Sequence, residues 1–168
     1  MRMKLAFLCG VVLTAASMAS AQTKWSGQEQ CGKPEPQYTA PVGDTPDHVL
    51  VLGKTKCTWS AGEIGGIKIK QADDTVISDV NGSSSRDRGY AVVSMENGDT
   101  ASVRWDGKAT MRGKAPSGGH GTWAFSSGTG KLKGIKGRGV YKGKCNKDGT
   151  SAFSVEGDYT LAAPKSAG

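Results

Sequence analysis

Hydrophobic and polar residues alternate along most of the chain, from about residue 47 to residue 161. Turn-forming residues interrupt this alternation at short intervals, and no long stretch has the 3.6-residue period of an amphipathic helix. The pattern is typical of an all-β sandwich or barrel. We therefore predict one all-β domain over residues 47–161.

The alternation also predicts the register of a hairpin between Tyr90 and Met111. Its inward-facing residues oppose one another if Glu96 pairs with Thr100. Residues 97–99 then form a three-residue loop, in which a glycine supplies the positive φ that such loops need.

A second hairpin covers residues 135–161, where aromatic, aliphatic and glycine residues take the odd-numbered positions. We therefore expect the odd-numbered face to point inward. With residues 148–150 as the loop, Tyr141 opposes Gly157 and Tyr159 opposes Gly139, so each ring covers a glycine of the partner strand. Ahead of this hairpin the inward set shifts by one residue at Gly134, which predicts a β-bulge.

Residues 1–21 have the parts of a signal peptide. Arg2 and Lys4 give a positive start, residues 5–16 are apolar, and residues 19–21 fit the small-x-small cleavage pattern. The apolar run is shorter than the ~20 residues that a spanning helix needs. We predict cleavage before Gln22, a periplasmic or extracellular location, and no transmembrane segment in the mature chain.

Two segments flank the predicted β domain. Residues 22–46 are polar and are interrupted by four prolines, so we expect an extended arm or covering loop there. Residues 162–168 are expected to be a frayed tail.

Cleavage of the signal peptide changes both the charge and the cysteine count. The formal charge of +7 loses the two positive charges of Arg2 and Lys4 and becomes +5. Cys9 is also lost, which leaves Cys31, Cys57 and Cys145. In an oxidising compartment three such cysteines allow one disulfide, and the sequence leaves all three pairings open. We favour Cys57 with Cys145, because both fall in predicted strands, and expect Cys31 to be the free thiol.

The segment Ser-Gly-Thr-Gly-Lys-Leu-Lys-Gly-Ile-Lys-Gly-Arg-Gly at residues 127–139 resembles the glycine-rich turn and strand of allene oxide cyclase-like and dirigent-like barrels. It also resembles small exported bacterial proteins with no assigned activity. The resemblance covers about residues 121–161 and implies an antiparallel barrel of about eight strands, preceded by the irregular N-terminal arm. The plant enzymes hold an oxylipin or a phenoxy-radical-derived intermediate inside the barrel. No functional residue of theirs can be placed on this chain, so no catalytic residue is assigned.

Aromatic residues at odd positions are the candidates for lining the barrel interior. They would contact a small apolar ligand if the lumen is open, although rings of this size can also fill an eight-stranded barrel. The candidate ligand-binding residues are Trp59, Trp105, Trp123, Tyr141 and Tyr159, with His120 at the rim.

No metal site or cofactor is predicted. His48 lies close in sequence to Asp44 and Asp47, but the spacing matches no recognised set of metal ligands. The segment Thr45–Asp47 is better interpreted as a turn that leads into a strand.

A run of basic residues near the C-terminus is the strongest charge feature. Its anion-binding candidates are Lys131, Lys133, Lys136 and Arg138, and Lys142 and Lys144 extend it. The predicted register sets Lys142 opposite Glu156, so we interpret the run as a solvated outer face and expect no nucleic-acid partner.

The leading functional hypothesis is an exported, non-enzymatic barrel that binds a small apolar or amphipathic ligand or serves an envelope role. One alternative is a cyclase or isomerase like the allene oxide cyclases, which would need an open cavity and a buried polar or ionisable group. The other is binding of an anionic polymer or a membrane surface through the basic run, which would need uncompensated positive charge. The oligomeric state is left open.

Overall fold

The structure is a computed structural model that describes residues 22–163. The predicted signal peptide and residues 164–168 of the predicted tail lie outside the described residues. The described strands are β1 (Thr23–Cys31), β2 (Gln37–Pro41), β3 (His48–Ala61), β4 (Glu63–Ile64), β5 (Ile67–Asn81), β6 (Ser84–Met95), β7 (Thr100–Arg112), β8 (Ala115–Gly128), β9 (Lys136–Cys145) and β10 (Ser151–Thr160), and a short 3₁₀ helix, η1 (Gly130–Leu132), joins β8 to β9.

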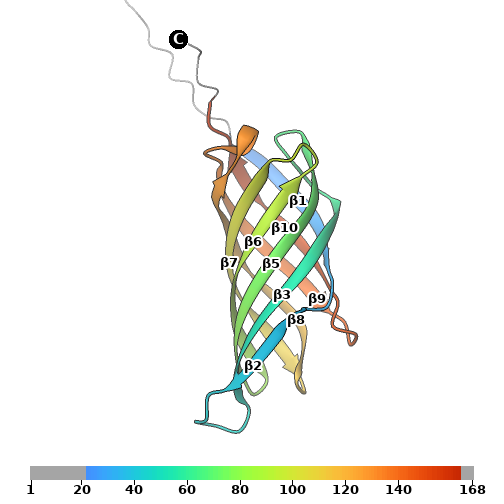
Figure 1. Ribbon diagram of the computed structural model, residues 1–168, viewed down its shortest axis with the longest axis vertical. Coiled ribbons are helices and arrows are strands. Elements are labelled where there is room, and N and C mark those ends of the chain that lie inside the picture. The colour runs from blue at the N-terminus through green and yellow to red at the C-terminus, as the bar shows by residue number, and fades with distance from the viewer. Residues whose placement is uncertain (1–21, 164–168) are drawn as a thin grey trace, which may run out of the picture.

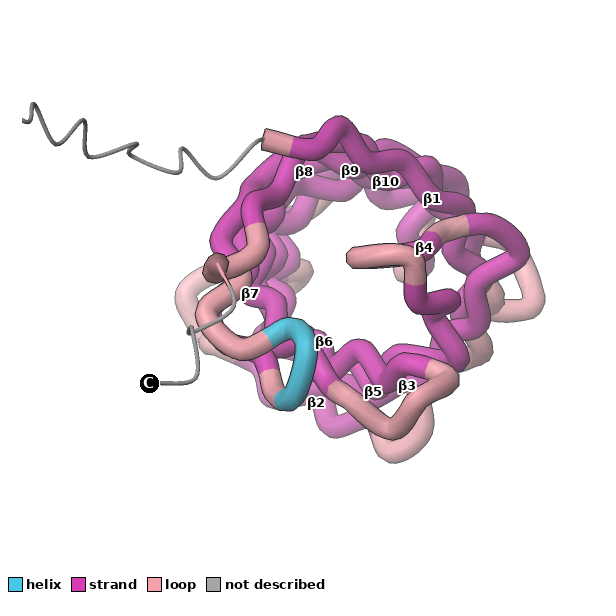
Figure 2. The backbone as a smooth tube through the Cα atoms, turned by 90° about the horizontal axis from the view of Figure 1, so that it is seen from above, coloured by secondary structure: helices cyan, strands magenta, loops and turns pink. Residues whose placement is uncertain are grey.

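Eight long strands form a closed antiparallel barrel, which confirms the predicted fold class (Figures 1 and 2). They run around the barrel in the order β1-β10-β9-β8-β7-β6-β5-β3, and β3 pairs back with β1 to close the ring. The short β2 continues along the N-terminal half of β3, and β4 pairs with the start of β5. Closure removes the exposed sheet edges that an open sheet would present.

Residues 23–31 of the predicted N-terminal arm are not irregular, and for these residues the prediction was wrong. Residues 23–31 form β1, which pairs along its length with β10 and at its C-terminal end with β3. The four prolines lie outside β1, in the link that follows it, at the end of β2 and in the turn before β3. β2 pairs only with β3, and Pro41 is tolerated at such an edge because its missing N–H breaks no ladder bond.

Both predicted hairpin registers were wrong by two residues, for the same reason. The first loop is residues 96–98, closed by the Met95 N–H donating to the Asp99 carbonyl at 2.9 Å. The second is residues 147–149, closed by the Asn146 N–H donating to the Thr150 carbonyl at 2.8 Å. Gly98 (φ +86°) and Gly149 (φ +89°) are the last loop residues, where a type I turn followed by a left-handed residue needs glycine.

A register shift of two residues leaves every side chain on its predicted face. The odd-numbered residues of β9 and β10 do point inward, as predicted. The cross-strand partners change, however: Tyr141 opposes Val155, Tyr159 opposes Gly137, and Gly139 opposes Gly157.

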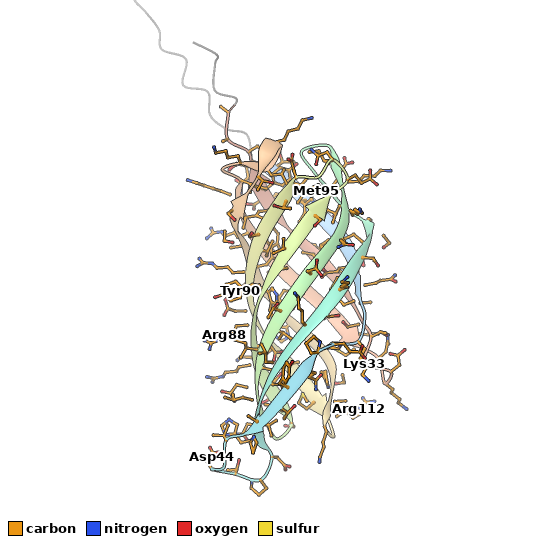
Figure 3. The ribbon with its side chains drawn as sticks, viewed as in Figure 1. Lys33, Asp44, Arg88, Tyr90, Met95 and Arg112 are labelled. Carbon is orange, nitrogen blue, oxygen red and sulfur yellow. A yellow bond between two sulfur atoms is a disulfide. The ribbon has the colours of Figure 1, made fainter. Side chains whose placement is uncertain are left out.

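A hydrophobic core closes one end of the barrel. Ile64, Met95 and Leu132 are each less than 2 % exposed there, and β4 lies across part of the opening (Figure 2). The predicted bulge at Gly134 is absent, since η1 and a turn connect β8 to β9 and bury both Leu132 and Ile135. We call this end, where Figure 3 labels Met95, the upper end.

The opposite end, where Figure 3 labels Asp44 and Arg112, is less tightly packed. The apolar side chains that point inward near it are only half-buried, and they are Val49, Val51, Val80 and Met111. Solvent therefore reaches these side chains at the lower end. Within residues 22–163 no helix has the length and apolar character needed to cross a membrane.

A disulfide joins Cys31 to Cys57, so the predicted pairing of Cys57 with Cys145 was wrong. Cys31 and Cys57 lie directly opposite each other in the β1–β3 register, with Cα atoms 4.0 Å apart. Cys145 is a free, half-buried thiol on β9. The error arose because Cys31 was assigned to the N-terminal arm. A cysteine in a loop gives no reason to expect a partner on β3, where β1 and β3 pair to close the barrel.

A candidate ligand site inside the barrel

Glycines on the inner wall make room for large aromatic rings. The Trp123 side chain lies against Gly139 and Gly157, Trp105 lies against Gly89, and Tyr141 lies against Gly121 and Gly107. A glycine leaves the wall without a side chain, so a ring from a neighbouring strand can cover the bare backbone. Aromatic rings therefore cover glycines as predicted, but Tyr141 covers Gly107 and Gly121 rather than Gly157.

The polar atom of each of these three rings lies close to a residue on another strand. The Trp105 Nε1–H donates to Asp74 at 3.0 Å, and the Trp123 Nε1–H donates to the Glu156 carbonyl at 3.2 Å. The Tyr141 hydroxyl reaches Gly107, the residue that pairs with Asp87 across β6 and β7. The indole N–H groups of Trp105 and Trp123 therefore have their hydrogen bonds satisfied within the wall of the barrel.

The rings contact one another in two groups. Trp25 packs against Trp59 and Trp123 with ring centroids 5.5 and 5.3 Å apart, and Tyr141 packs against Trp105 and Phe153 at 5.7 and 5.8 Å. These separations are in the range where tilted and edge-to-face aromatic pairs are favourable. The middle of the barrel is therefore a framework of packed rings.

Three acidic side chains face into this aromatic framework: Glu29 from β1, Asp74 from β5 and Asp87 from β6. Burial, reinforced by the nearby charge of Asp74, raises the pKa of Glu29 to about 8. Burial also raises the pKa of Asp74 to about 6, although its hydrogen bond from Trp105 acts in the opposite direction. Glu29 is therefore protonated and Asp74 ionised at neutral pH.

Burial and the charge of Asp87 raise two further pKa values inside the barrel. The pKa of Tyr141 lies well above its ordinary value, because of burial first and the Asp87 charge second. The same two causes, in the same order, raise the pKa of the Cys145 thiol. Both side chains are therefore neutral at physiological pH, and Cys145 has none of the thiolate character of a reactive cysteine.

Three buried polar atoms inside the barrel have no hydrogen-bond partner among residues 22–163. They are the indole nitrogens of Trp25 and Trp59 and the Oδ1 oxygen of Asp87. More than nine in ten buried polar groups in proteins are hydrogen-bonded, so three such atoms in one lumen require an explanation. Two are donors and one is an acceptor.

Of the predicted ligand-binding residues, the structure brings Trp59, Trp105, Trp123 and Tyr141 into this lumen. Tyr159 lies instead in the upper core, where its hydroxyl accepts a hydrogen bond from the Gly65 N–H at 2.9 Å. His120 is not a rim residue, because it points outward from β8 and is exposed.

Sequence reasoning missed Trp25 and all three acids. Trp25, Gly27, Glu29 and Cys31 alternate as an inward-facing strand should, and that signal was available within the segment assigned to the arm. Asp74 lies on the inner face because a register irregularity between Ile69 and Gln71 moves the inward positions of β5 from odd to even numbers.

Neither candidate cluster of metal ligands holds as a metal site. Glu29, Cys31 and Cys57 place an oxygen and two sulfurs within 4.8 Å of one another, but the two sulfurs are bonded to each other and are not thiolates. His48 bonds to Asp44 through Nδ1 at 2.7 Å and to Asp79 through Nε2 at 2.8 Å. The turn interpretation is confirmed, since the Thr45 N–H donates to the Asp44 carboxylate and the His48 N–H to the Thr45 carbonyl.

The outer wall carries the basic run, and its predicted charge compensation was partly wrong. Lys142 lies opposite Ser154 rather than Glu156, whereas Arg138 lies directly opposite Asp158. Lys131 and Lys133 belong to the β8–β9 connection, and Lys136 and Arg138 to β9, so the four candidates do not form one row across the sheet.

A broad depression of about 970 Å³ also lies on the outer wall across β1, β10, β9, β8 and β7. Its charged lining is balanced, with three basic residues (Lys24, Arg104 and Arg138) and three acidic residues (Asp106, Glu156 and Asp158). It therefore lacks the uncompensated positive charge that a polyanion site needs.

The closed eight-stranded barrel with its glycine-lined aromatic interior has the dirigent-like barrel fold, as the segment at residues 127–139 suggested. No family model and no curated protein matches the chain. Among solved structures the chain is similar to the pterocarpan synthase dirigent protein GePTS1, with a TM-score of 0.53 and 14% identity over 92% of this chain and 100% of that one. It is also similar to a protein of unknown function from the DUF3224 family of Shewanella oneidensis MR-1, with a TM-score of 0.51 and 17% identity over 85% of this chain and 99% of that one.

Proposed function

We propose that this protein binds a small amphipathic molecule inside its barrel and works outside the cytoplasm. The observation that carries the proposal is the set of three unpartnered polar atoms, on Trp25, Trp59 and Asp87, in a lumen otherwise walled by aromatic rings. Apolar walls with a few convergent polar groups are the common composition of small-molecule sites. The half-buried side chains at the lower end supply the entry route.

Two features support the proposed location. The Cys31–Cys57 disulfide is of a kind that persists in oxidising compartments and is rare in the cytosol. The first 21 residues have the charge, apolar stretch and cleavage site of a signal peptide.

An acid–base isomerase is a second candidate, favoured by the Glu29 and Asp74 pair. Their pKa values of about 8 and about 6 lie on either side of neutrality, so one group can donate a proton while the other accepts one. This arrangement supplies the buried ionisable group that a cyclase or isomerase in a barrel would need.

Tryptophan fluorescence, titrated with small aromatic alcohols, amines and carboxylates and with fatty acids and oxylipins, tests the binding proposal. We expect a saturable change in emission with at least one probe, because the indoles line the proposed site. Trp25→Phe should weaken binding by removing one unpartnered N–H while keeping a ring. The exposed outer-wall variant Tyr90→Phe is the matched control and should have no effect.

If none of these probes changes the tryptophan emission, the proposal is wrong. If a probe does bind, it is recovered after incubation and identified by its mass and its proton NMR spectrum. Unchanged probe supports binding alone, whereas an isomerised product whose formation Glu29→Gln abolishes supports the second candidate.

A further inference from the structure

The acidic side chains inside the barrel have no cationic partner. Glu29, Asp74 and Asp87 point inward, whereas every lysine and arginine among residues 22–163 is exposed. The charged group that acts on the pKa of Glu29 is the acidic Asp74, whereas burial and hydrogen bonds from Trp105 and the Thr75 backbone act on the pKa of Asp74. Buried acids ordinarily pair with a cation or with several hydrogen-bond donors, because an isolated buried charge is costly. The lumen therefore has negative character without the group that would balance it.

Asp87 is the acid that offers a ligand an acceptor oxygen without a hydrogen bond. Its Oδ1 oxygen is buried and accepts no hydrogen bond, whereas Asp74 already accepts one from Trp105. The Tyr141 ring, which packs against Trp105 and Phe153, lies along the wall toward it. A carboxylate oxygen beside aromatic faces is a favourable environment for an ammonium group, which gains both a charge-assisted hydrogen bond and cation–π contacts.

The spacing of the acids favours an organic cation over a metal ion. Glu29, Asp74 and Asp87 are not among the groups whose ligand atoms converge within 4.8 Å, so the three carboxyl groups cannot coordinate one ion together. An organic cation needs only one direct carboxylate contact and gains the rest of its stabilisation from aromatic surface and from the negative potential.

We propose that the lumen takes a small amine with an aromatic or aliphatic body, its ammonium group at Asp87 and its body against the rings of Trp105 and Tyr141. This inference rests on the proposed function and names the chemical class of the ligand.

Three probes that share one skeleton and differ in charge test the inference: 2-phenylethylammonium, 2-phenylethanol and 3-phenylpropanoate. Isothermal titration of the mature protein at pH 7.4 and low salt gives the three affinities. The ammonium remains charged at this pH because aliphatic amines titrate near the lysine value of about 10.4. We expect it to bind about tenfold or more tightly than the alcohol, and the propanoate to bind most weakly.

Asp87→Asn keeps the shape of the side chain and removes its charge. It should weaken ammonium binding by about tenfold or more and leave alcohol binding unchanged, which also shows that the variant is folded. Asp106→Asn is the matched control, because Asp106 lies on the adjacent strand but points to the outer wall. It removes the same charge from the protein and should change neither affinity.

The outcomes separate this inference from the proposed function. If the alcohol or the propanoate binds as tightly as the ammonium, or Asp87→Asn leaves ammonium binding intact, the cation inference is wrong and binding inside the barrel stands. If none of the three probes binds, the cation inference is wrong, and the broader probe set described above decides the proposed function.

Discussion

Replacing Trp123 by alanine is expected to lower the free energy of unfolding by about 3–5 kcal/mol, the cost of deleting a large buried aromatic side chain. Trp123 is 5% exposed, covers Gly139 and Gly157, and packs against Trp25 and Phe125. Its removal would bare the backbone of two strands at once. Urea unfolding followed by circular dichroism measures the loss.

The matched control for this variant is Val140→Ala, which truncates an exposed side chain on the outer face of β9. We expect that change to stay within about 0.5 kcal/mol of the parent protein. If Trp123→Ala were equally mild, the middle of the barrel would not be the packed aromatic framework described above.

Loss of the disulfide is expected to have the second largest effect. Replacing both Cys31 and Cys57 by alanine should lower the free energy of unfolding by about 3–4 kcal/mol, because the bond joins residues 26 apart in sequence and restricts the unfolded chain. The bond also lies at the seam where β1 pairs with β3 over only a few residues, so its loss should loosen closure of the barrel.

Thiol titration of a chain that starts at Gln22, under denaturing, non-reducing conditions, checks the pairing itself. One reactive thiol is expected, and Cys145→Ala should abolish it. Three thiols, or a mapped disulfide that contains Cys145, would contradict the assignment. Cys145→Ala should also be much less destabilising than the double variant, because Cys145 is free and half-buried.

Alternation along the sequence predicted which face of each strand points inward far better than it predicted which residues pair between neighbouring strands. The faces of β9 and β10 were correct although their register was wrong by two residues, because a shift of two conserves the inward set. The register depended on where Gly149 sits in its loop, a matter of turn geometry that alternation does not report. The same error recurred at Gly98.

The site was only half predictable, because its acids lie where local patterns are weak. Trp59, Trp105, Trp123 and Tyr141 stood out as large residues at inward positions. Glu29 was hidden by the proline-rich segment that follows β1, and the alternation around Asp74 was displaced by a register irregularity. An isolated acid on an apolar face is also normally taken for an outward residue, since burying it is costly.

The indole signals in a ¹H–¹⁵N NMR spectrum test the central claim, ligand binding inside the barrel, most directly. Each tryptophan contributes one Nε1–H signal, which single Trp→Phe variants assign, and Trp25 and Trp59 have no hydrogen-bond partner whereas Trp105 and Trp123 do. Saturating ligand, taken from the fluorescence titration, should move the Trp25 and Trp59 signals downfield as their N–H groups gain an acceptor. If those two signals stay in place while amides of the outer wall shift, binding occurs on the surface and the account of the lumen is wrong.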